Sequence, residues 1–508
     1  MKNKLFILIH LLIINLIISP GLSAQTNEQR IKNIEAAFPV IDKMMTDFAK
    51  QHHSPGLAYG LVVDGQLVHS GNSGYANISE NIKASSQSAF RIASMTKSFT
   101  GLAILKLRDE GKLKLDDPAD LYIPELKNQK YLTADAAPIT IRNLLTHTAG
   151  FPEDNAWGDR QLATTDEQLL TMVKKGFSFS NNPGTKMEYS NTGFALLGFI
   201  IKKVSGLSCQ DYIIQNILQP LGMTHTYWEY DKVPAKELAH GYKWSNGQWQ
   251  EEPLLHDGAY GPMGGLISTI EDFSKYMAFY LSAMPARNEK DNGPVKRGSL
   301  REMQYPWNFT EVYDKNKRTN GKPCPTAAGY NYGLRWIKDC ENRVYVGHSG
   351  GLPGFGSNWN VMPDYGIGFV SFCNFTYAPM SAINTAILDT LIQIAKLTPR
   401  QLAVSDILHQ RKNELLKILP DWKGATNATI FADNFFLDYS SDALRKEATE
   451  IFNKAGKIIK VGEIIPENNL RGSFIMEGEN ADIEIRFTLT PQNPALIQEY
   501  HIRERKKK

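Results

Sequence analysis

The chain has 508 residues, more than a single hydrophobic core normally holds, so two or three structural units are expected. Apolar residues make up 42% and charged residues 21% of the chain, which excludes a disordered or fibrous protein. The formal net charge is only +3, from 56 basic and 53 acidic residues spread along the chain. We therefore expect no nucleic-acid partner and no membrane-surface patch.

The first residues have the pattern of an export signal. Lys2 and Lys4 precede an apolar run over residues 5–18, and Ala24 offers a small residue before a cleavage site. The run is shorter than the roughly 20 apolar residues that a bilayer span needs. We expect residues 1–24 to be a cleaved signal peptide, with an uncleaved anchor as the alternative, and the rest of the chain to be periplasmic or secreted.

The four cysteines are too few for a disulfide scaffold and lack metal-ligand spacing. Cys209 and Cys373 lie in apolar stretches, which predicts buried thiols that pack as small hydrophobes. Cys324 and Cys340 flank a predicted strand and can meet in an oxidising compartment, but the sequence leaves open whether they pair. We expect neither a metal nor a cofactor.

Hydrophobic periodicity predicts a large domain over residues 25–397. A first helix is expected to run to about His52, and Asp64-Gly65 predicts the turn of an antiparallel hairpin. A mainly helical stretch follows from Ser94 to Leu281, and residues 285–298 and 315–326 are expected to be surface loops. Four strands and a closing helix are predicted at residues 332–337, 343–346, 357–362, 366–373 and Met380–Ala395.

The early and late strands are expected to share one antiparallel sheet, flanked by the first and last helices, with the middle of the chain as a helical lobe. Residues 398–422 are predicted to be a helical connector. Residues 423–508 are predicted to form a small α+β domain, a packing or substrate-docking appendage without a nucleophile. Its elements are one helix, Ser441–Ala455, and four alternating strands at residues 458–464, 470–476, 481–489 and 495–503.

The first of three candidate motifs is Ser94-Met95-Thr96-Lys97, at the predicted start of a helix. Residues three apart share a helix face, so the Lys97 amine can approach the Ser94 hydroxyl. A serine needs a neighbouring base to act as a nucleophile, and a lysine serves only if burial or positive charge lowers its pKa. The pattern occurs once in the chain, but alone it also fits an ordinary helix start with a solvated lysine.

The second motif is Tyr189-Ser190-Asn191, which follows a Pro-Gly turn and precedes an apolar helix. A tyrosine in such a loop can exchange a proton with the serine or the leaving group if cations depress its pKa. The Asn191 amide can bridge Lys97 and a substrate amide. The similar Tyr75-Ala76-Asn77 precedes the serine and is assigned to structure.

The third motif, His348-Ser349-Gly350-Gly351, ends a predicted strand. Small residues there allow a substrate backbone to lie alongside, and the Gly351 amide can join the Ser94 amide as an oxyanion donor. A lone histidine at this place is equally compatible with a hydrogen-bonded surface residue.

In this order the motifs resemble the serine β-lactamase and penicillin-binding protein superfamily, most closely class C β-lactamases, D-Ala-D-Ala carboxypeptidases and β-lactamase-like esterases. Residues 144–150, 219–223 and 264–269 add to the resemblance, which spans roughly residues 30–395. It implies an α/β sandwich of the β-lactamase type, and a structural part for His147. It also implies a nucleophile at Ser94, proton handling by Lys97 and Tyr189, substrate binding by Asn191, His348, Ser349 and Gly350, and an oxyanion hole of the Ser94 and Gly351 amides.

His348 departs from the Lys-Thr-Gly that is usual in β-lactamases. A histidine is mostly neutral at pH 7, which weakens the charge that would attract a substrate carboxylate. We therefore expect an exported serine hydrolase that cleaves a peptide, amide or ester, with a small-molecule or peptide substrate for which the cell wall is one candidate source.

Three alternatives stay open at this point. One is a true β-lactamase, and another is a penicillin-binding or peptidoglycan-docking protein with little or no turnover. A metallohydrolase is a weak third, because His52-His53 lacks an acidic partner at ligand spacing. The sequence also leaves open the acyl substrate, the oligomeric state and the role of the C-terminal domain.

Overall fold

The computed structural model describes residues 27–318, 320–400 and 402–507, so the predicted signal peptide lies outside the described residues. The chain divides into two compact units between Thr398 and Pro399. Each unit has its own buried core.

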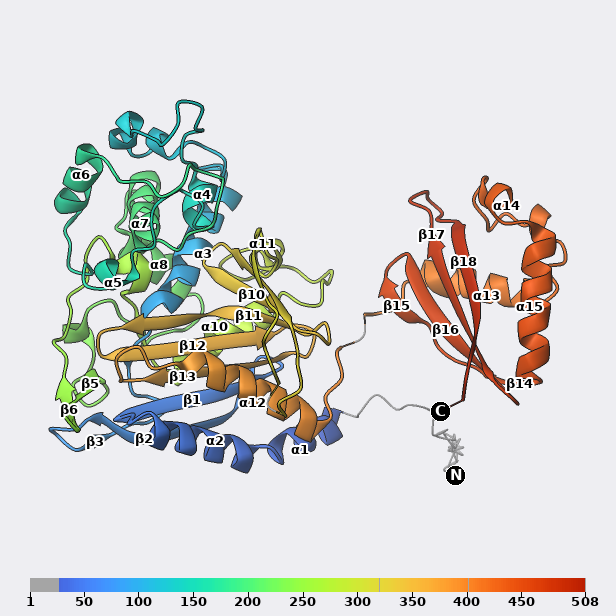
Figure 1. Ribbon diagram of the computed structural model, residues 1–508, viewed down its shortest axis with the longest axis horizontal. Coiled ribbons are helices and arrows are strands. Elements are labelled where there is room, and N and C mark those ends of the chain that lie inside the picture. The colour runs from blue at the N-terminus through green and yellow to red at the C-terminus, as the bar shows by residue number, and fades with distance from the viewer. Residues whose placement is uncertain (1–26, 319, 401, 508) are drawn as a thin grey trace, which may run out of the picture. The chain divides into compact units, whose positions relative to one another are not determined.

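The first unit is built on a nine-stranded antiparallel sheet that joins the early strands of the chain to the late ones (Figure 1). β1 and β13 lie side by side in its middle, with Leu57 opposite Cys373. Every residue of β1, β12 and β13 is buried, because both faces of this part of the sheet are covered. In sheet order the strands are β3 (Ile82–Lys83), β2 (Gln66–Asn77), β1 (Gly56–Val63), β13 (Ile367–Cys373), β12 (Phe355–Met362), β11 (Val344–Leu352), β10 (Leu334–Lys338), β9 (Thr326–Asn331) and β8 (Asn308–Tyr313).

Helices from both ends of the unit cover one face of the sheet. α1 (Asn27–Glu35), α2 (Phe38–Gln51) and α12 (Met380–Ala395) pack there around the buried side chains of Ile41 and Leu388. α10 (Ile270–Leu281) contacts β1, β2, β12 and β13. The first and last helices flank the sheet, as the sequence pattern predicted, and α10 adds a second helical layer, so the middle strands are enclosed.

The middle of the chain forms the helical lobe, with α3 (Thr96–Asp109) at its centre (Figure 1). Phe99, Leu102 and Leu105 are fully buried, and most of the other residues of α3 are buried as well, which is typical of a helix enclosed by the rest of the fold. α3 contacts α7 (Asn191–Ser205), α8 (Cys209–Ile213) and α9 (Gly261–Gly264). The lobe and its surroundings also contain α4 (Ile141–Leu145), α5 (Asn155–Gly158), α6 (Asp166–Lys175), α11 (Arg297–Met303) and the paired strands β4 (Phe90–Arg91) with β7 (Ile267–Ser268) and β5 (Tyr242–Ser245) with β6 (Gln248–Glu251).

Three boundaries in this unit differ from the prediction. The expected first helix is two helices, because Pro39, near the start of α2, has no N–H for a continuous helix. α11 begins inside the expected 285–298 loop. β8 precedes the expected 315–326 loop, and β9 begins at Thr326; these two strands extend the sheet beyond β10.

The cysteines fall into two kinds. Cys324, just before β9, forms a disulfide with Cys340, which lies between β10 and β11. The sequence had left this pairing open. Cys209 and Cys373 are free and buried, as predicted.

The second unit is an α+β domain with one strand more than predicted. Its sheet has the order β14 (Ile458–Val461), β16 (Arg471–Gly478), β17 (Asp482–Leu489) and β18 (Ile497–Arg505), and β15 (Ile465–Asn468) also pairs with β16. The expected first strand is split because β14 and β15 pair with different parts of β16 on either side of Gly462. α14 (Phe435–Asp438) and α15 (Ser441–Ala455) complete the domain together with α13 (Asp406–Ile418).

The prediction that residues 398–422 form a connector between the domains is wrong. Leu408, Leu415 and Trp422 are buried in the core of the second unit, where the Trp422 ring packs against Tyr500. α13 is therefore part of that domain, because its apolar face supplies core that the sheet and α15 alone do not cover.

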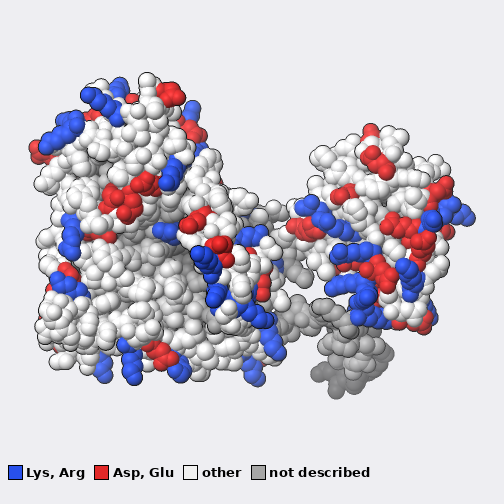
Figure 2. Space-filling view, in the orientation of Figure 1, with Lys and Arg blue, Asp and Glu red and all other residues white. Residues whose placement is uncertain are grey.

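Among the described residues, no single helix is long and apolar enough to cross a membrane; the bent pair of α7 with Cys209–Leu218 reaches that length and composition together. Basic and acidic side chains are interspersed on the face seen in Figure 2.

Candidate active site

Ser94 and Lys97 meet where a short turn passes into α3. Ser94 lies on a turn of 3-10 helix, Ala93–Met95, and α3 begins two residues later than expected, at Thr96. The three-residue spacing still brings Lys97 Nζ to 3.1 Å from Ser94 Oγ. Ala93 has φ 50°, a left-handed conformation that is uncommon for a residue with a Cβ and recurs where a functional group is held in place.

Lys97 is fully buried, and its amine has three partners. Besides Ser94, Nζ donates to Asn191 Oδ1 at 2.6 Å and to the Met263 carbonyl at 2.8 Å. Burial lowers the pKa of Lys97 to about 7; the Asp159 and Asp154 carboxylates oppose this shift, and the Arg335 guanidinium adds to it. A lysine with this pKa is partly neutral near pH 7, so it can accept a proton from the serine.

Tyr189 borders the same site from the loop before α7. Lys97 Nζ lies 4.8 Å from the centre of its ring. The sequence made proton exchange by Tyr189 conditional on cations that depress its pKa. Burial instead raises this pKa above the usual range, and a hydrogen bond with Ser94 and the charge of Arg335 offset the rise only in part. The phenol is therefore protonated at neutral pH, which suits a proton donor and not a phenolate base.

Asn191 lies deeper than predicted. Its side chain is fully buried, and while Oδ1 accepts from Lys97, Nδ2 donates to Asp159 Oδ1 at 3.3 Å and to Asn155 Oδ1 at 3.2 Å. The structure thus brings Asn191 to Lys97 as expected but places its amide between Lys97 and Asp159, where we expected a bridge to substrate.

The glycines of the third motif bring β11 against the turn that carries Ser94. A Cβ added to Gly350 would lie 2.3 Å from the Ile92 carbonyl oxygen, so no larger residue fits this approach. Ser357 Oγ, on β12, also donates to that carbonyl at 2.8 Å. Ser94 lies two residues after Ile92, and Gly351 directly follows Gly350, so both residues flank this contact; Ser349 and Gly351 are half-buried.

His348 does not present its ring to the cleft, and this corrects its expected place beside a substrate carboxylate. The side chain is buried, with Nε2 3.1 Å from the Tyr330 hydroxyl and Nδ1 against the Ser349 carbonyl. Burial, together with the charges of Arg335 and Lys97, holds the pKa of His348 well below its usual range. The imidazole is neutral, as the sequence indicated, but it supports Tyr330 and carries no charge to the substrate.

His147 also packs behind Tyr189. Its ring centre lies 4.2 Å from that of Tyr189 and 4.6 Å from that of Tyr330, and its Nδ1 accepts from the Ser190 amide at 3.0 Å. This arrangement fixes the loop that carries Tyr189, in keeping with the structural part predicted for His147.

Arg335 is the functional candidate that sequence reasoning missed. It is exposed on β10, directly across from Gly347 on β11, and its guanidinium carbon lies 5.8 Å from the Tyr189 ring centre. The predicted strand 332–337 already contained this residue, and the β10–β11 register, which the sequence does not reveal, is the signal that would have placed it beside the third motif.

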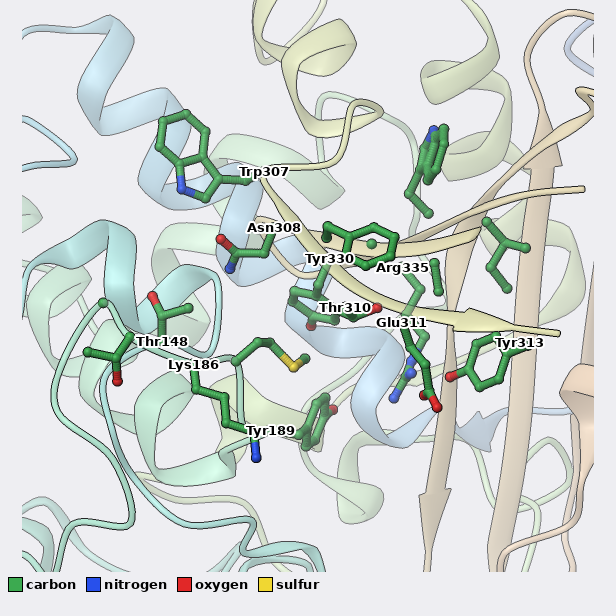
Figure 3. A pocket seen from close by; sticks show the side chains of 18 residues that line it. Thr148, Lys186, Tyr189, Trp307, Asn308, Thr310, Glu311, Tyr313, Tyr330 and Arg335 are labelled. Atoms are coloured by element: carbon green, nitrogen blue, oxygen red, sulfur yellow. The ribbon is translucent and has the colours of Figure 1, made fainter. Parts of the chain in front are cut away.

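A cavity of about 640 Å³ opens beside Tyr189 and Arg335 (Figure 3). Lys186 and Tyr189 border it from the loop before α7, while Asn308, Thr310, Glu311 and Tyr313 line it along β8. Several of its apolar side chains are exposed, with Trp307 53%, Phe309 68% and Tyr313 38% accessible. The cavity therefore combines the Arg335 cation, beside Tyr189, with an aromatic wall; Ser94 and Lys97 are not among the residues that line it.

The fold is shared with a solved structure. The structure of the octameric penicillin-binding protein homologue from Pyrococcus abyssi superimposes with a TM-score of 0.60, and the match covers 91% of this chain and 99% of that one. The two sequences are 24% identical, so this likeness concerns the fold alone.

The Beta-lactamase family model matches residues 41–393, and the chain belongs to this family. Protein flp of Staphylococcus aureus strain N315 is 30% identical over 385 residues, which cover 74% of this chain and 70% of that protein. Beta-lactamase-like protein 2 of Dictyostelium discoideum is 32% identical over 296 residues, 56% of this chain and 54% of that protein. The predicted family and fold class are confirmed, and the second unit lies beyond the matched residues.

Proposed function

We propose that the chain is an exported serine hydrolase that cleaves a peptide, amide or ester bond through an acyl-enzyme on Ser94. The observation that carries the proposal is the 3.1 Å contact between Ser94 Oγ and a buried Lys97 whose pKa is about 7. A solvated lysine at the start of a helix would keep its ordinary pKa and would not serve as a base near neutral pH.

Acylation begins when neutral Lys97 takes the proton of the Ser94 hydroxyl and Oγ attacks the substrate carbonyl carbon. The carbonyl π electrons move to its oxygen, where the amides of Ser94 and Gly351 stabilise the charge. As the intermediate collapses, the leaving group takes a proton from the Tyr189 hydroxyl, and the Lys97 ammonium returns a proton to the phenolate. The products of this half are the acyl-enzyme and a neutral amine or alcohol.

Deacylation repeats the sequence with water as the nucleophile. Water gives a proton to Lys97 as its oxygen attacks the ester carbonyl, and the departing Ser94 oxygen is reprotonated by the Lys97 ammonium. Lys97 is the base in both halves and Tyr189 acts only in the first, so the mechanism requires no further acid or base.

The cleft favours substrates that join an anionic group to a bulky apolar one. Arg335 offers a permanent charge to a carboxylate near the reacting carbonyl, in the place where neutral His348 offers none. Trp307 and Phe309 provide exposed rings for an apolar or aromatic portion. A peptide or amino-acid derivative with a free carboxylate fits this combination.

Labelling by a fluorophosphonate probe, followed by a substrate panel, tests the proposal. We expect wild-type protein to be labelled and Ser94→Ala to lose labelling, and we expect turnover of carboxylate-bearing esters or D-amino-acid dipeptides. Labelling of Ser94→Ala would overturn the nucleophile assignment. Labelling without turnover across p-nitrophenyl esters, nitrocefin and dipeptides would favour a penicillin-binding protein that acylates only.

Export is supported by the basic and apolar pattern of residues 1–24 and by the Cys324–Cys340 disulfide, a bond typical of oxidising compartments. Mass spectrometry of the mature N-terminus after expression with the full leader tests this part. A protein that keeps Met1 and stays in the cytoplasm would contradict it.

A further inference from the structure

Within the part of the chain that the structure describes, no charged group lies at contact distance from the buried amine of Lys97. Its three hydrogen bonds go to a hydroxyl, an amide oxygen and a backbone carbonyl, all neutral acceptors. An ammonium that forms in such a place during catalysis needs a counter-charge nearby, because burial without one is unfavourable.

The Asp159 carboxylate is connected to Lys97 through the side chain of Asn191. Its Oδ1 accepts from Asn191 Nδ2 at 3.3 Å, and the oxygen of the same Asn191 amide accepts from Lys97 at 2.6 Å. Asp159 Oδ2 accepts from the Tyr377 hydroxyl at 3.1 Å. The carboxylate is only 3% exposed, so it faces the protein and not the solvent. A continuous chain of hydrogen bonds thus runs from Ser94 through Lys97 and Asn191 to Asp159 and Tyr377.

The local backbone is shaped to hold this chain. A Cβ added to Gly158 would lie 2.9 Å from Asn191 Cβ, so a glycine lets the end of α5 approach the start of α7 closely. A second carboxylate from the same segment, Asp154, caps α7 by accepting from the amides of Asn191 at 2.5 Å and Thr192 at 2.9 Å. Two neighbouring acids therefore have different partners, since one holds the helix end and the other holds the Asn191 side chain.

We propose that Asp159 is the counter-ion of Lys97 and acts on it through the Asn191 amide. When Ser94 transfers its proton to Lys97, Asp159 stabilises the new ammonium and keeps its own negative charge. Asp159 takes no proton and touches no substrate, so it is a positioning residue. The inference rests on the proposed function, because it assigns a part in the proton transfer from Ser94.

The charges around the pair agree with this assignment. Asp159 is the carboxylate that most strongly favours the charged form of Lys97, ahead of Asp154. Burial raises the pKa of Asp159 to about 6, which leaves it largely ionised at pH 7 and above. The other titratable groups that face Lys97 are the guanidinium of Arg335, the neutral rings of His147 and His348, and the protonated phenol of Tyr189; those that face Asp159 are Asp154 and the Tyr377 hydroxyl.

The test is the pH dependence of the second-order rate constant for fluorophosphonate labelling of the full chain. The acid limb of this profile is the range in which the rate rises with pH as Lys97 loses its proton. Removing a carboxylate lowers the pKa of Lys97, so Asp159→Asn moves the acid limb to lower pH, by about one pH unit. Its plateau falls about tenfold, because the ammonium is no longer stabilised in the transition state. Asp154→Asn is the matched control: it removes the same charge from the same segment, lowers thermal stability through the lost helix cap, and moves the acid limb less.

Rate loss at every pH with an unmoved acid limb in Asp159→Asn would show a merely structural role and overturn the inference. An equal shift in Asp154→Asn would also overturn it, since any nearby charge would then suffice. If Asp159→Asn does not fold, Tyr377→Phe tests the link from its exposed end. Loss of the Tyr377 hydroxyl, which donates to Asp159, raises the pKa of Asp159 and moves the acid limb slightly to lower pH. A profile identical to that of the wild type would contradict the inference.

The two proposals fail differently. Labelling that survives in Ser94→Ala removes the proposed function, whatever Asp159→Asn does. If labelling is lost in Ser94→Ala but its pH profile is unchanged in Asp159→Asn, only the counter-ion proposal fails.

Discussion

Arg335 and Tyr189 lie together at the mouth of the cleft, with the guanidinium carbon 5.8 Å from the ring centre. They come from different parts of the fold, β10 and the loop before α7. The contact places a permanent positive charge beside the residue proposed to protonate the leaving group.

Arg335→Ala should therefore weaken reaction with substrates that carry a carboxylate near the scissile bond. We expect kcat/KM to fall about tenfold for these substrates, mainly through KM, and to change little for neutral esters of the same acyl group. Arg335→Lys keeps the charge but loses the planar donor pair, so its kcat/KM for the carboxylate substrates should lie between those of the wild type and Arg335→Ala. Equal losses for charged and neutral substrates would mean that Arg335 supports Tyr189 and does not select the substrate.

The rate of acylation should depend on a single group with a pKa of about 7. Lys97 must be neutral to accept the Ser94 proton, so the rate falls as pH drops below 7. Because the pKa of Tyr189 is raised, loss of its proton should not lower the rate until pH passes the usual tyrosine value of about 10. Labelling rates measured from pH 5 to pH 10 test this, and a maximum below pH 6 would contradict the base assignment.

Gly350→Ala should separate β11 from the nucleophile turn. The new methyl group would lie 2.3 Å from the Ile92 carbonyl oxygen, so the strand or the turn must move. Since displacements of about 1 Å can cost about 100-fold in rate, we expect labelling of Ser94 to slow by about that factor. Gly298→Ala is the control, because the nearest atom to its added Cβ is 4.0 Å away and its backbone is helical. Unchanged labelling of Gly350→Ala would show that the junction tolerates the shift.

Reduction of the Cys324–Cys340 disulfide should lower stability more than activity. The bond closes a loop with a sequence separation of 16, and constraining a loop of about 15 residues in the unfolded chain stabilises the fold by about 3 kcal/mol. Thermal unfolding with and without reductant measures the effect. The double variant Cys324→Ser/Cys340→Ser should already unfold at the lower temperature and should no longer respond to reductant.

The parts of the site that one helix holds were predictable, and the parts that depend on packing between distant segments were not. The approach of Lys97 to Ser94 followed from a three-residue spacing, while the roles of these two residues, of Tyr189 and of the third motif rested on a family resemblance. The depth of Asn191 could not be foreseen, because it depends on the close approach that Gly158 allows. Arg335 was hidden for a similar reason, since its position follows from the register of β10 against β11.

The fold shows the same division. β1 and β13 are buried throughout and were recognisable from apolar runs, whereas β12, equally buried, contains Ser357, Asn358 and Asn360. α13 has a mixed, charged sequence that resembles a linker, and only the packing of Leu408 and Leu415 against the second sheet identifies it as core.

β8 borders the cleft, is paired on one side only, and turns most of its side chains outward. Substitutions there remove little buried surface, so they should alter folding free energy only slightly while they reshape the wall that the substrate meets. Members of the family can thus differ in what this wall accepts by changing this edge, with the residues around α3 left intact. Such a separation lets new specificities evolve without first acquiring compensating stability.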